Sequence, residues 1–235
     1  MTDFSTIFQT KYSCALLADA AFRADISFGS APVSLKPIDR AMKLAGPIIT
    51  VQANNDLVTI LAGIHQAKAG DIVVITNPSN EVVALIGDLI ATEASRKGLG
   101  GIIVDGLVRD TTELIAIGVP IFCGGAYPIG PLKLPQDLKG IGHIGDELRL
   151  GNTTVKSGDW AFGDADGVIF LKSLDLPKVW EWAEKSYHNE ESLAAQIRSG
   201  VSLGELLDLE TFMKERASNP QADFNQHISK LGQAI

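Results

Sequence analysis

Three carboxylates and one guanidinium follow one another at a spacing that could do chemistry on a small acid. Asp88 stands twenty residues before the dipeptide Arg109-Asp110, and Glu113 follows after two more. Carboxylate oxygens are ligands that hard cations such as Mg²⁺ and Mn²⁺ prefer. A guanidinium presents a planar fork of donors that matches a carboxylate and keeps its charge. These residue types therefore favour a site that holds a divalent cation and binds an anionic substrate.

The residues between these positions predict the elements that bring them together. Leu89 to Lys97 suit a helix, Gly98 to Gly101 interrupt it, and Ile102 to Val104 form a short buried strand. The rise is roughly 1.5 Å per residue in a helix and 3.3 Å in a strand, so the strand returns the chain close to its start. We therefore expect Asp88 to face the Arg-Asp dipeptide.

Helix and strand signals alternate along the rest of the chain, which indicates layers of sheet and helix. Ser13 is expected to cap a first helix, and Asn55 or Asp56 a second one that ends at Gly70. The last twenty residues are polar and are expected to be loosely held. The other expected elements are strands at 48–51, 71–76 and from 120, a short helix to 117, short strands between 140 and 171, and helices from 174 to 209.

Composition fits a globular enzyme with one large domain or with a domain and an appendage. The chain has 235 residues, of which 46% are hydrophobic and 20% charged, and it is long enough to bury a sizeable core. A net charge of −8 argues against a nucleic-acid surface, because phosphate binding needs clustered Lys and Arg. The sequence shows neither a signal peptide nor a run of about 18 apolar residues. Two cysteines, Cys14 and Cys123, favour a reducing compartment, by default the cytoplasm.

Other motifs have plainer structural interpretations. The pair Gly124-Gly125 lacks the surrounding pattern of a nucleotide-binding loop, and the four histidines have no metal-ligand spacing. The aspartates of FGDADGV predict a tight turn rather than a calcium loop. By itself, even an aspartate before a helix is usually only an N-cap.

Several longer blocks resemble one enzyme family. The segments AGPIITVQA, HQAKAGDIVVI, GVPIFCGGAYPIGP and SGDWAFGDADGVIFL are similar, in order, to blocks of the class II pyruvate aldolases. Those enzymes cleave 4-hydroxy-4-methyl-2-oxoglutarate and 4-carboxy-4-hydroxy-2-oxoadipate, and their family includes the RraA-like proteins, named for a regulator of RNA-degrading activity. The resemblance covers roughly residues 13 to 200. It implies an α/β fold, a three-layer ββα sandwich of the swivelling-domain kind, with a C-terminal helical extension.

The resemblance also implies how the chain divides and assembles. We expect an aldolase domain over 1–172 and, over 173–235, a helical extension that packs on a neighbouring subunit. The segment HNEESLAAQIRSGVSL resembles one that supplies an acidic residue to a neighbour's site, and both Glu190 and Glu191 fit that role. The expected assembly is a homotrimer or a dimer of trimers.

A metal-dependent carbon–carbon lyase is the activity that the resemblance implies. Cleavage beside a 2-oxo acid leaves a pyruvate enolate, which needs either a lysine Schiff base or a divalent cation, and the predicted site offers carboxylates without a central lysine. By resemblance Asp110 holds Mg²⁺ or Mn²⁺ directly, and Glu113 holds it through water. Arg109 is expected to bind the pyruvyl end. Oxaloacetate decarboxylation needs the same enolate and is expected as a second activity.

The start of the helix after Gly87 is expected to bind the same substrate carboxylate. The first backbone N–H groups of a helix lack intrahelical partners and lie at the positive end of its dipole, so Leu89 and Ile90 are the candidate donors. Asp88 beside them is expected to pair with Arg109 and to orient a metal-bound water for proton transfer.

Two other functions stay open. A non-catalytic RraA-like regulator of RNA processing would act through protein contacts, for which an acidic surface suits a basic partner. A lyase or hydrolase for a different oxo acid is the second, because residues 77–81 read Asn-Pro-Ser-Asn-Glu where the family is usually glycine-rich. That difference alters the wall over the substrate.

Overall fold

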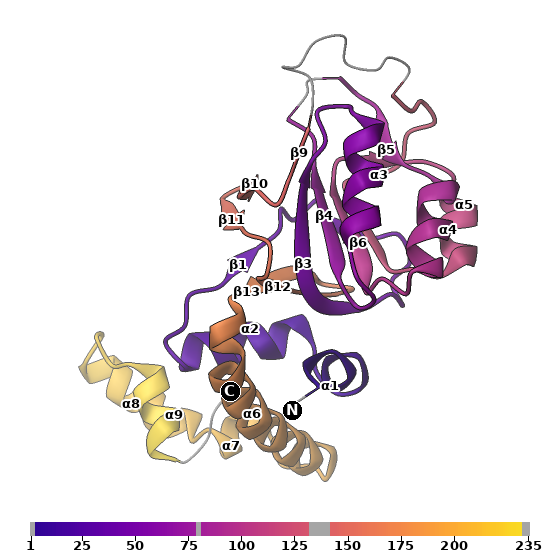
Figure 1. Ribbon diagram of the computed structural model, residues 1–235. Coiled ribbons are helices and arrows are strands. Elements are labelled where there is room, and N and C mark those ends of the chain that lie inside the picture. The colour runs from indigo at the N-terminus through magenta and orange to yellow at the C-terminus, as the bar shows by residue number, and fades with distance from the viewer. Residues whose placement is uncertain (1–2, 79–80, 132–141, 232–235) are drawn as a thin grey trace.

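A mixed sheet forms the middle of the computed structural model, which describes residues 3–78, 81–131 and 142–231 (Figure 1). Strands β3, β4, β6 and β8 run parallel at its centre, and the remaining strands join antiparallel. Runs such as Ile72–Thr76 are buried throughout, as expected for strands covered on both faces. The strand order is β1 (Gly29–Ser30), β13 (Gly167–Leu171), β12 (Trp160–Asp164), β3 (Leu44–Gln52), β4 (Ile72–Thr76), β6 (Gly101–Asp105), β8 (Ile121–Cys123) and β2 (Lys36–Pro37), with β9 (His143–Ile144) paired to β3.

The two faces of this sheet are covered by different layers. Val73 and Ile75 pack under the helices α3 (Leu57–Gln66), α4 (Asp88–Arg96) and α5 (Thr111–Ile117). Ile72 and Val74, which alternate with them, pack on the other face against the ribbon of β10 (Leu148–Leu150) and β11 (Thr153–Val155), since successive strand residues point to opposite faces. Helices, sheet and ribbon make the expected three-layer ββα sandwich.

A second two-stranded sheet leads into the helical layer. β5 (Ala84–Ile86) and β7 (Leu107–Val108) run parallel, and each is followed at once by a helix, α4 after β5 and α5 after β7. The sequence did not predict β5, because a three-residue strand is too short to show a period. Its consequence is that two strand-to-helix turns lie side by side.

The N-terminal and C-terminal helices pack below the sheet (Figure 1). An aromatic cluster, which includes Phe8, Tyr12, Phe162 and Trp180, joins the first half of α6 to the rest of the same chain. The packing of residues 173–235 on a neighbouring subunit stays a prediction. The helices concerned are α1 (Phe4–Thr10), α2 (Cys14–Arg23) and α6 (Leu176–Arg198), which a short 3₁₀ turn, η2 (Ser173–Asp175), precedes.

Beyond α6 the chain forms a small lobe of three helices, α7 (Leu203–Leu206), α8 (Leu209–Ser218) and α9 (Phe224–Lys230). All of α9 lies within the last twenty residues, so over Phe224–Lys230 the tail is a packed helix and not the loosely held segment that was expected. The reason is that the rings of Phe212, Phe224 and His227 pack against one another, and the His227 ring forms a hydrogen bond of 2.9 Å with the carbonyl of Leu207.

Several local predictions are confirmed. Ser13 caps α2 by accepting from the Leu16 amide, and Asp56, not Asn55, caps α3. Cys14 and Cys123 are free and buried, and burial raises the pKa of both thiols, so neither is an activated nucleophile. Within the described ranges, the structure contains no helix both long and apolar enough to cross a membrane.

One polar cluster ties α6 to the segment between α1 and α2. The Glu184 carboxylate accepts from Lys11 at 2.7 Å and from the Tyr12 hydroxyl, and the His188 ring lies 2.8 Å from the same carboxylate. These hydrogen bonds, led by that from Lys11, lower the pKa of Glu184 to about 2. Because the carboxylate binds its proton more weakly in the folded chain, it stabilises the fold above its unfolded pKa and loses that effect as pH falls toward 2.

We therefore expect Glu184→Gln to lower the thermal midpoint at pH 7, with a gap to the parent protein that closes as pH falls from about 4.5 toward 2. The matched control is Glu181→Gln, which removes only an exposed pair with Lys185 on the same helix and should change little. Thermal unfolding followed by tryptophan fluorescence across this pH range measures both. An equal gap at pH 7 and pH 2 would contradict the expectation.

Candidate active site

The two strand-to-helix turns bring the predicted residues together. Ile86 pairs with Val108, and the amide of Arg109 donates to the carbonyl of Ile86 at 3.0 Å. Gly87 is the N-cap of α4, and Asp110 is the N-cap of α5. The start of α4 and the Arg-Asp dipeptide therefore face one another across this short parallel pair.

Asp110 is held in a strained conformation and turns away from its own helix. Its backbone is left-handed, with φ 60° and ψ 41°, and its side chain makes no capping hydrogen bond to α5. Instead, Oδ2 accepts from the amide of Asp88 at 3.3 Å and lies 3.5 Å from Nε of Arg109. Left-handed geometry costs a non-glycine residue about 1 kcal/mol, and such strain gathers at functional sites.

Part of the Asp110 carboxylate stays available. Its side chain is 36% exposed, and Oδ1 has no protein partner among the residues that the structure describes. An accessible carboxylate oxygen beside a guanidinium fits a hard cation that keeps most of its waters. Across the described ranges, no three His, Cys, Asp or Glu side chains gather into a metal cage, so such a cation would take few direct protein ligands.

The carboxylate of Asp88 has a different partner from the one expected. Its Oδ1 accepts from the amide of Leu89 at 2.7 Å, and the ion pair of Arg109 is with Asp110. The expected pairing of Asp88 with Arg109 is therefore not formed in this structure, because the carboxylate folds back onto the start of its own helix. Leu89 is also not a free donor here, whereas the amide of Ile90 has no acceptor among the described residues.

Gly87 is required for the close approach of the two turns. A Cβ at Gly87 would lie 2.4 Å from Oδ2 of Asp110 and 3.2 Å from Cγ and Nε of Arg109. Real side-chain carbons do not come so near, so any larger residue would push the ion pair off α4. The glycine predicted as a substrate-binding residue thus has a second role in packing.

Glu113 lies in the first turn of α5, exposed to solvent. It follows Asp110 by three residues, and on a helical turn such residues share a side. The position is compatible with a contact to a cation through water.

Glu190 and Glu191 lie on α6, apart from α4 and α5 (Figure 1). Burial raises the pKa of Glu190, while the charge of Arg23 on the same chain opposes that rise. Neither glutamate joins Asp110 within one chain, so their role at a neighbour's site stays a prediction.

One acidic residue in this region, Asp105, is not among the residues that the sequence predicts for the site. Asp105 ends β6 in register with Thr76 of β4, and burial raises the pKa of its carboxyl group. Ligands of parallel sheets bind at the carboxyl ends of the strands, where Asp105 lies. Its position after the run Gly-Ile-Ile-Val was the signal that could have marked it.

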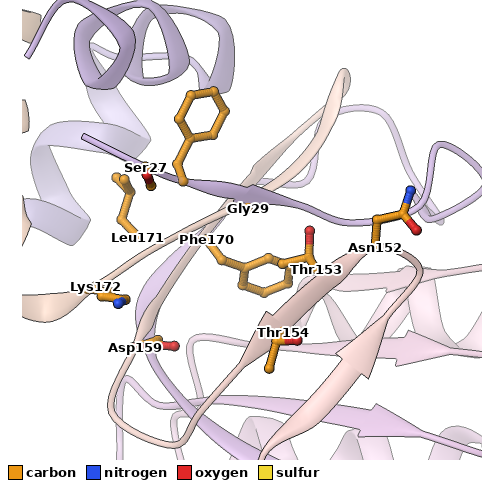
Figure 2. Close-up of a pocket in the computed structure, with 10 residues that line it drawn as sticks. Ser27, Gly29, Asn152, Thr153, Thr154, Asp159, Phe170, Leu171 and Lys172 are labelled. Atoms are coloured by element: carbon orange, nitrogen blue, oxygen red, sulfur yellow. The ribbon is translucent and has the colours of Figure 1, made fainter. Parts of the chain in front are cut away.

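A separate hollow of about 240 Å³ lies beside β1 and β13, under the ring of Phe170 (Figure 2). Two of its polar groups already have partners, since Oγ1 of Thr153 bonds the backbone of Ser30 and the carboxylate of Asp159 accepts from the Lys156 amide. The residues that line this hollow do not combine a guanidinium with neighbouring carboxylates, as the residues around Asp110 do. The turn before α4 is therefore the better candidate site.

Comparisons with known proteins show which family this chain is similar to. A protein of Halalkalibacterium halodurans named "Putative 4-hydroxy-4-methyl-2-oxoglutarate aldolase" is 31% identical over 169 residues, 72% of this chain and 78% of its own. A Bacillus cereus protein of the same name is 32% identical over 142 residues, 60% of this chain and 86% of its own.

Among solved structures, Streptomyces coelicolor RraAS2 shares the fold with a TM-score of 0.64 at 21% identity, covering 83% of this chain and 96% of its own. It is described as an unusual member of the RNase ES inhibitor RraA protein family. The family model RraA-like, Aldolase/RraA, matches residues 14–170. With two thirds of its length matched by that model, and with the sandwich that carries the Arg109-Asp110 turn, the chain belongs to the RraA-like family.

Proposed function

We propose that this protein is a divalent-metal-dependent lyase that releases pyruvate from a 4-hydroxy-2-oxo diacid, such as 4-hydroxy-4-methyl-2-oxoglutarate or 4-carboxy-4-hydroxy-2-oxoadipate. The observation that carries the proposal is the strained Asp110, whose carboxylate leaves its own helix to lie between Arg109 and the start of α4. The names of the two relatives support the same class of reaction.

The residues present fit a cation of the Mg²⁺ or Mn²⁺ type. Asp110 would hold it through its accessible oxygen, and Glu113 would hold it through water. When bound, a divalent cation acts as a Lewis acid on the substrate's 2-oxo group.

Arg109 would bind the C1 carboxylate and the 2-oxo oxygen, where negative charge grows as the bond breaks. A donor aimed at such charge contributes about 3–4 kcal/mol to lowering the barrier. The Ile90 amide, at the positive end of α4, would bind the same carboxylate. Together they would fix the pyruvyl end against the site.

Asp88 would move the protons. One of its oxygens is held by the Leu89 amide, so the other can accept a proton from a positioned water. Loss of the C4 hydroxyl proton breaks the C3–C4 bond and frees an oxo acid, and protonation of the remaining enolate at C3 gives pyruvate. Decarboxylation of oxaloacetate leaves the same enolate and should be a second activity.

We further propose that copies of the chain associate, as a trimer or a dimer of trimers. The support is the lobe of α7 to α9, on which Leu203, Leu209 and Met213 are 41–62% exposed. In such an assembly Glu190 or Glu191 would have a neighbouring site to reach.

Chelation tests the proposal. Protein treated with EDTA should release no pyruvate above the spontaneous rate from either diacid or from oxaloacetate, and added Mg²⁺ or Mn²⁺ should restore release above the rate of the same metal without protein. Full activity after chelation would contradict the mechanism. No pyruvate above the spontaneous rate with any substrate or metal would favour a protein that acts through contacts, as an RNA-processing regulator would.

A further inference from the structure

The side chain of Arg109 lies close to two glycines, Gly87 along its Cγ and Nε and Gly130 at its tip. A Cβ at Gly130 would lie 2.8 Å from Nη1 of Arg109 and 3.4 Å from its Cζ. The guanidinium therefore rests directly against the backbone of Gly130, although almost half of the Arg109 side chain is exposed.

The wall that carries Gly130 is fixed to the rest of the site. Along residues 124–130, the amide of Gly124 donates to the carbonyl of Gly106, and the amide of Tyr127 donates to that of Val108, each at 2.8 Å. The carbonyl of Ile129, next to Gly130, accepts from β5 at the same distance. Gly130 itself is buried, so this wall cannot retreat without breaking hydrogen bonds.

Space, not backbone conformation, is what calls for a glycine at this position. The φ of Gly130 lies outside the left-handed region, so alanine could adopt the same backbone without strain. Among the described residues, the atoms nearest to the added methyl group would be two of the guanidinium and, at 3.8 Å, the carbonyl oxygen of Ala84. A change at Gly130 therefore acts on Arg109 before anything else.

We infer that Gly130 is a positioning residue, which sets the place and plane of the Arg109 guanidinium for binding a substrate carboxylate. Its effect on turnover rests on the proposed function, whereas its effect on the guanidinium does not. A bidentate contact depends on the plane of the fork, so a displaced fork should bind and stabilise the reacting end less well.

Gly130→Ala should lower kcat for pyruvate release by about 10–100-fold, the range for a misplaced catalytic group, with thermal stability nearly unchanged. The matched control is Gly204→Ala on α7, where a Cβ makes only ordinary contacts of 3.7 Å or more. The decisive comparison uses Arg109→Lys as background. Lysine has no guanidinium, so Gly130→Ala should there cost about twofold or less, because residues that act through one another are not additive.

Equal losses in both backgrounds would overturn the inference. Crystal structures of the parent protein and of Gly130→Ala give a readout that does not depend on activity, and they should show the guanidinium moved away from residue 130 in the variant. A guanidinium that keeps its position in the variant overturns the inference. A parent protein that releases no pyruvate contradicts only the proposed function. If Gly130→Ala does not fold, the double variant with Arg109→Lys should fold. A double variant that does not fold would overturn the inference as well.

Discussion

Replacing Asp110 with alanine is expected to reduce pyruvate release to background at any practical concentration of Mg²⁺ or Mn²⁺. The proposed cation would lose its direct ligand, and water alone polarises a 2-oxo group poorly. The same change removes the partner of Arg109 and of the Asp88 amide. Initial rates measured over a series of metal concentrations test this, and a rate that recovers at high metal would contradict it.

A second substitution separates chemistry from folding. Alanine is disfavoured at φ 60°, so Asp110→Ala could lose activity through strain. Asparagine tolerates the left-handed region and keeps an oxygen for the Asp88 amide, but it has no charge with which to hold a cation. Asp110→Asn should therefore fold like the parent protein and be as inactive as the alanine variant. A folded, active Asp110→Asn would remove Asp110 from the metal site.

Arg109→Lys is expected to lower turnover by about 10²–10³-fold, the range for losing one donor to a developing oxyanion, while metal affinity stays nearly intact. Lysine keeps the positive charge but not the planar fork. Saturation kinetics with oxaloacetate, run beside a Mn²⁺ titration, separates these two effects.

The matched control for that prediction is Arg96→Lys on α4. Arg96 is exposed and pairs with Glu93 on the surface of the same helix, where an ion pair contributes little to stability. Its turnover should equal that of the parent protein. Near-normal turnover by Arg109→Lys would show that charge alone is enough at this position.

Much of the fold follows from patterns that a sequence displays directly. Strands such as Ile72–Thr76 are continuous apolar runs, and Ser13 and Asp56 are side chains that cap helices. The elements that the sequence did not predict are either very short, like the strand Ala84–Ile86, or stabilised by contacts with distant residues, like the helix Phe224–Lys230. Local propensity is weak in both cases, so tertiary packing decides.

The proximity of three candidate residues was predictable from the sequence, but the pairing of their side chains was not. The spacing of Asp88, Arg109 and Asp110 predicted that they meet, and the structure brings them together. The sequence could not show that Asp88 would bond the Leu89 amide, because a carboxylate at a helix start has several donors within reach. Nor could it show that Gly130 lies beside Arg109, since that contact depends on how the 124–130 segment folds back over β7.

The most direct test of the metal-dependent site is a Mn²⁺ titration of the parent protein, Asp110→Asn and Arg109→Lys, with free Mn²⁺ measured by electron paramagnetic resonance. We expect the parent protein and Arg109→Lys to bind Mn²⁺ with similar affinity, and Asp110→Asn to bind none over the same range. Normal Mn²⁺ binding by Asp110→Asn would contradict the assignment of Asp110 as the metal ligand and, with it, the proposed mechanism.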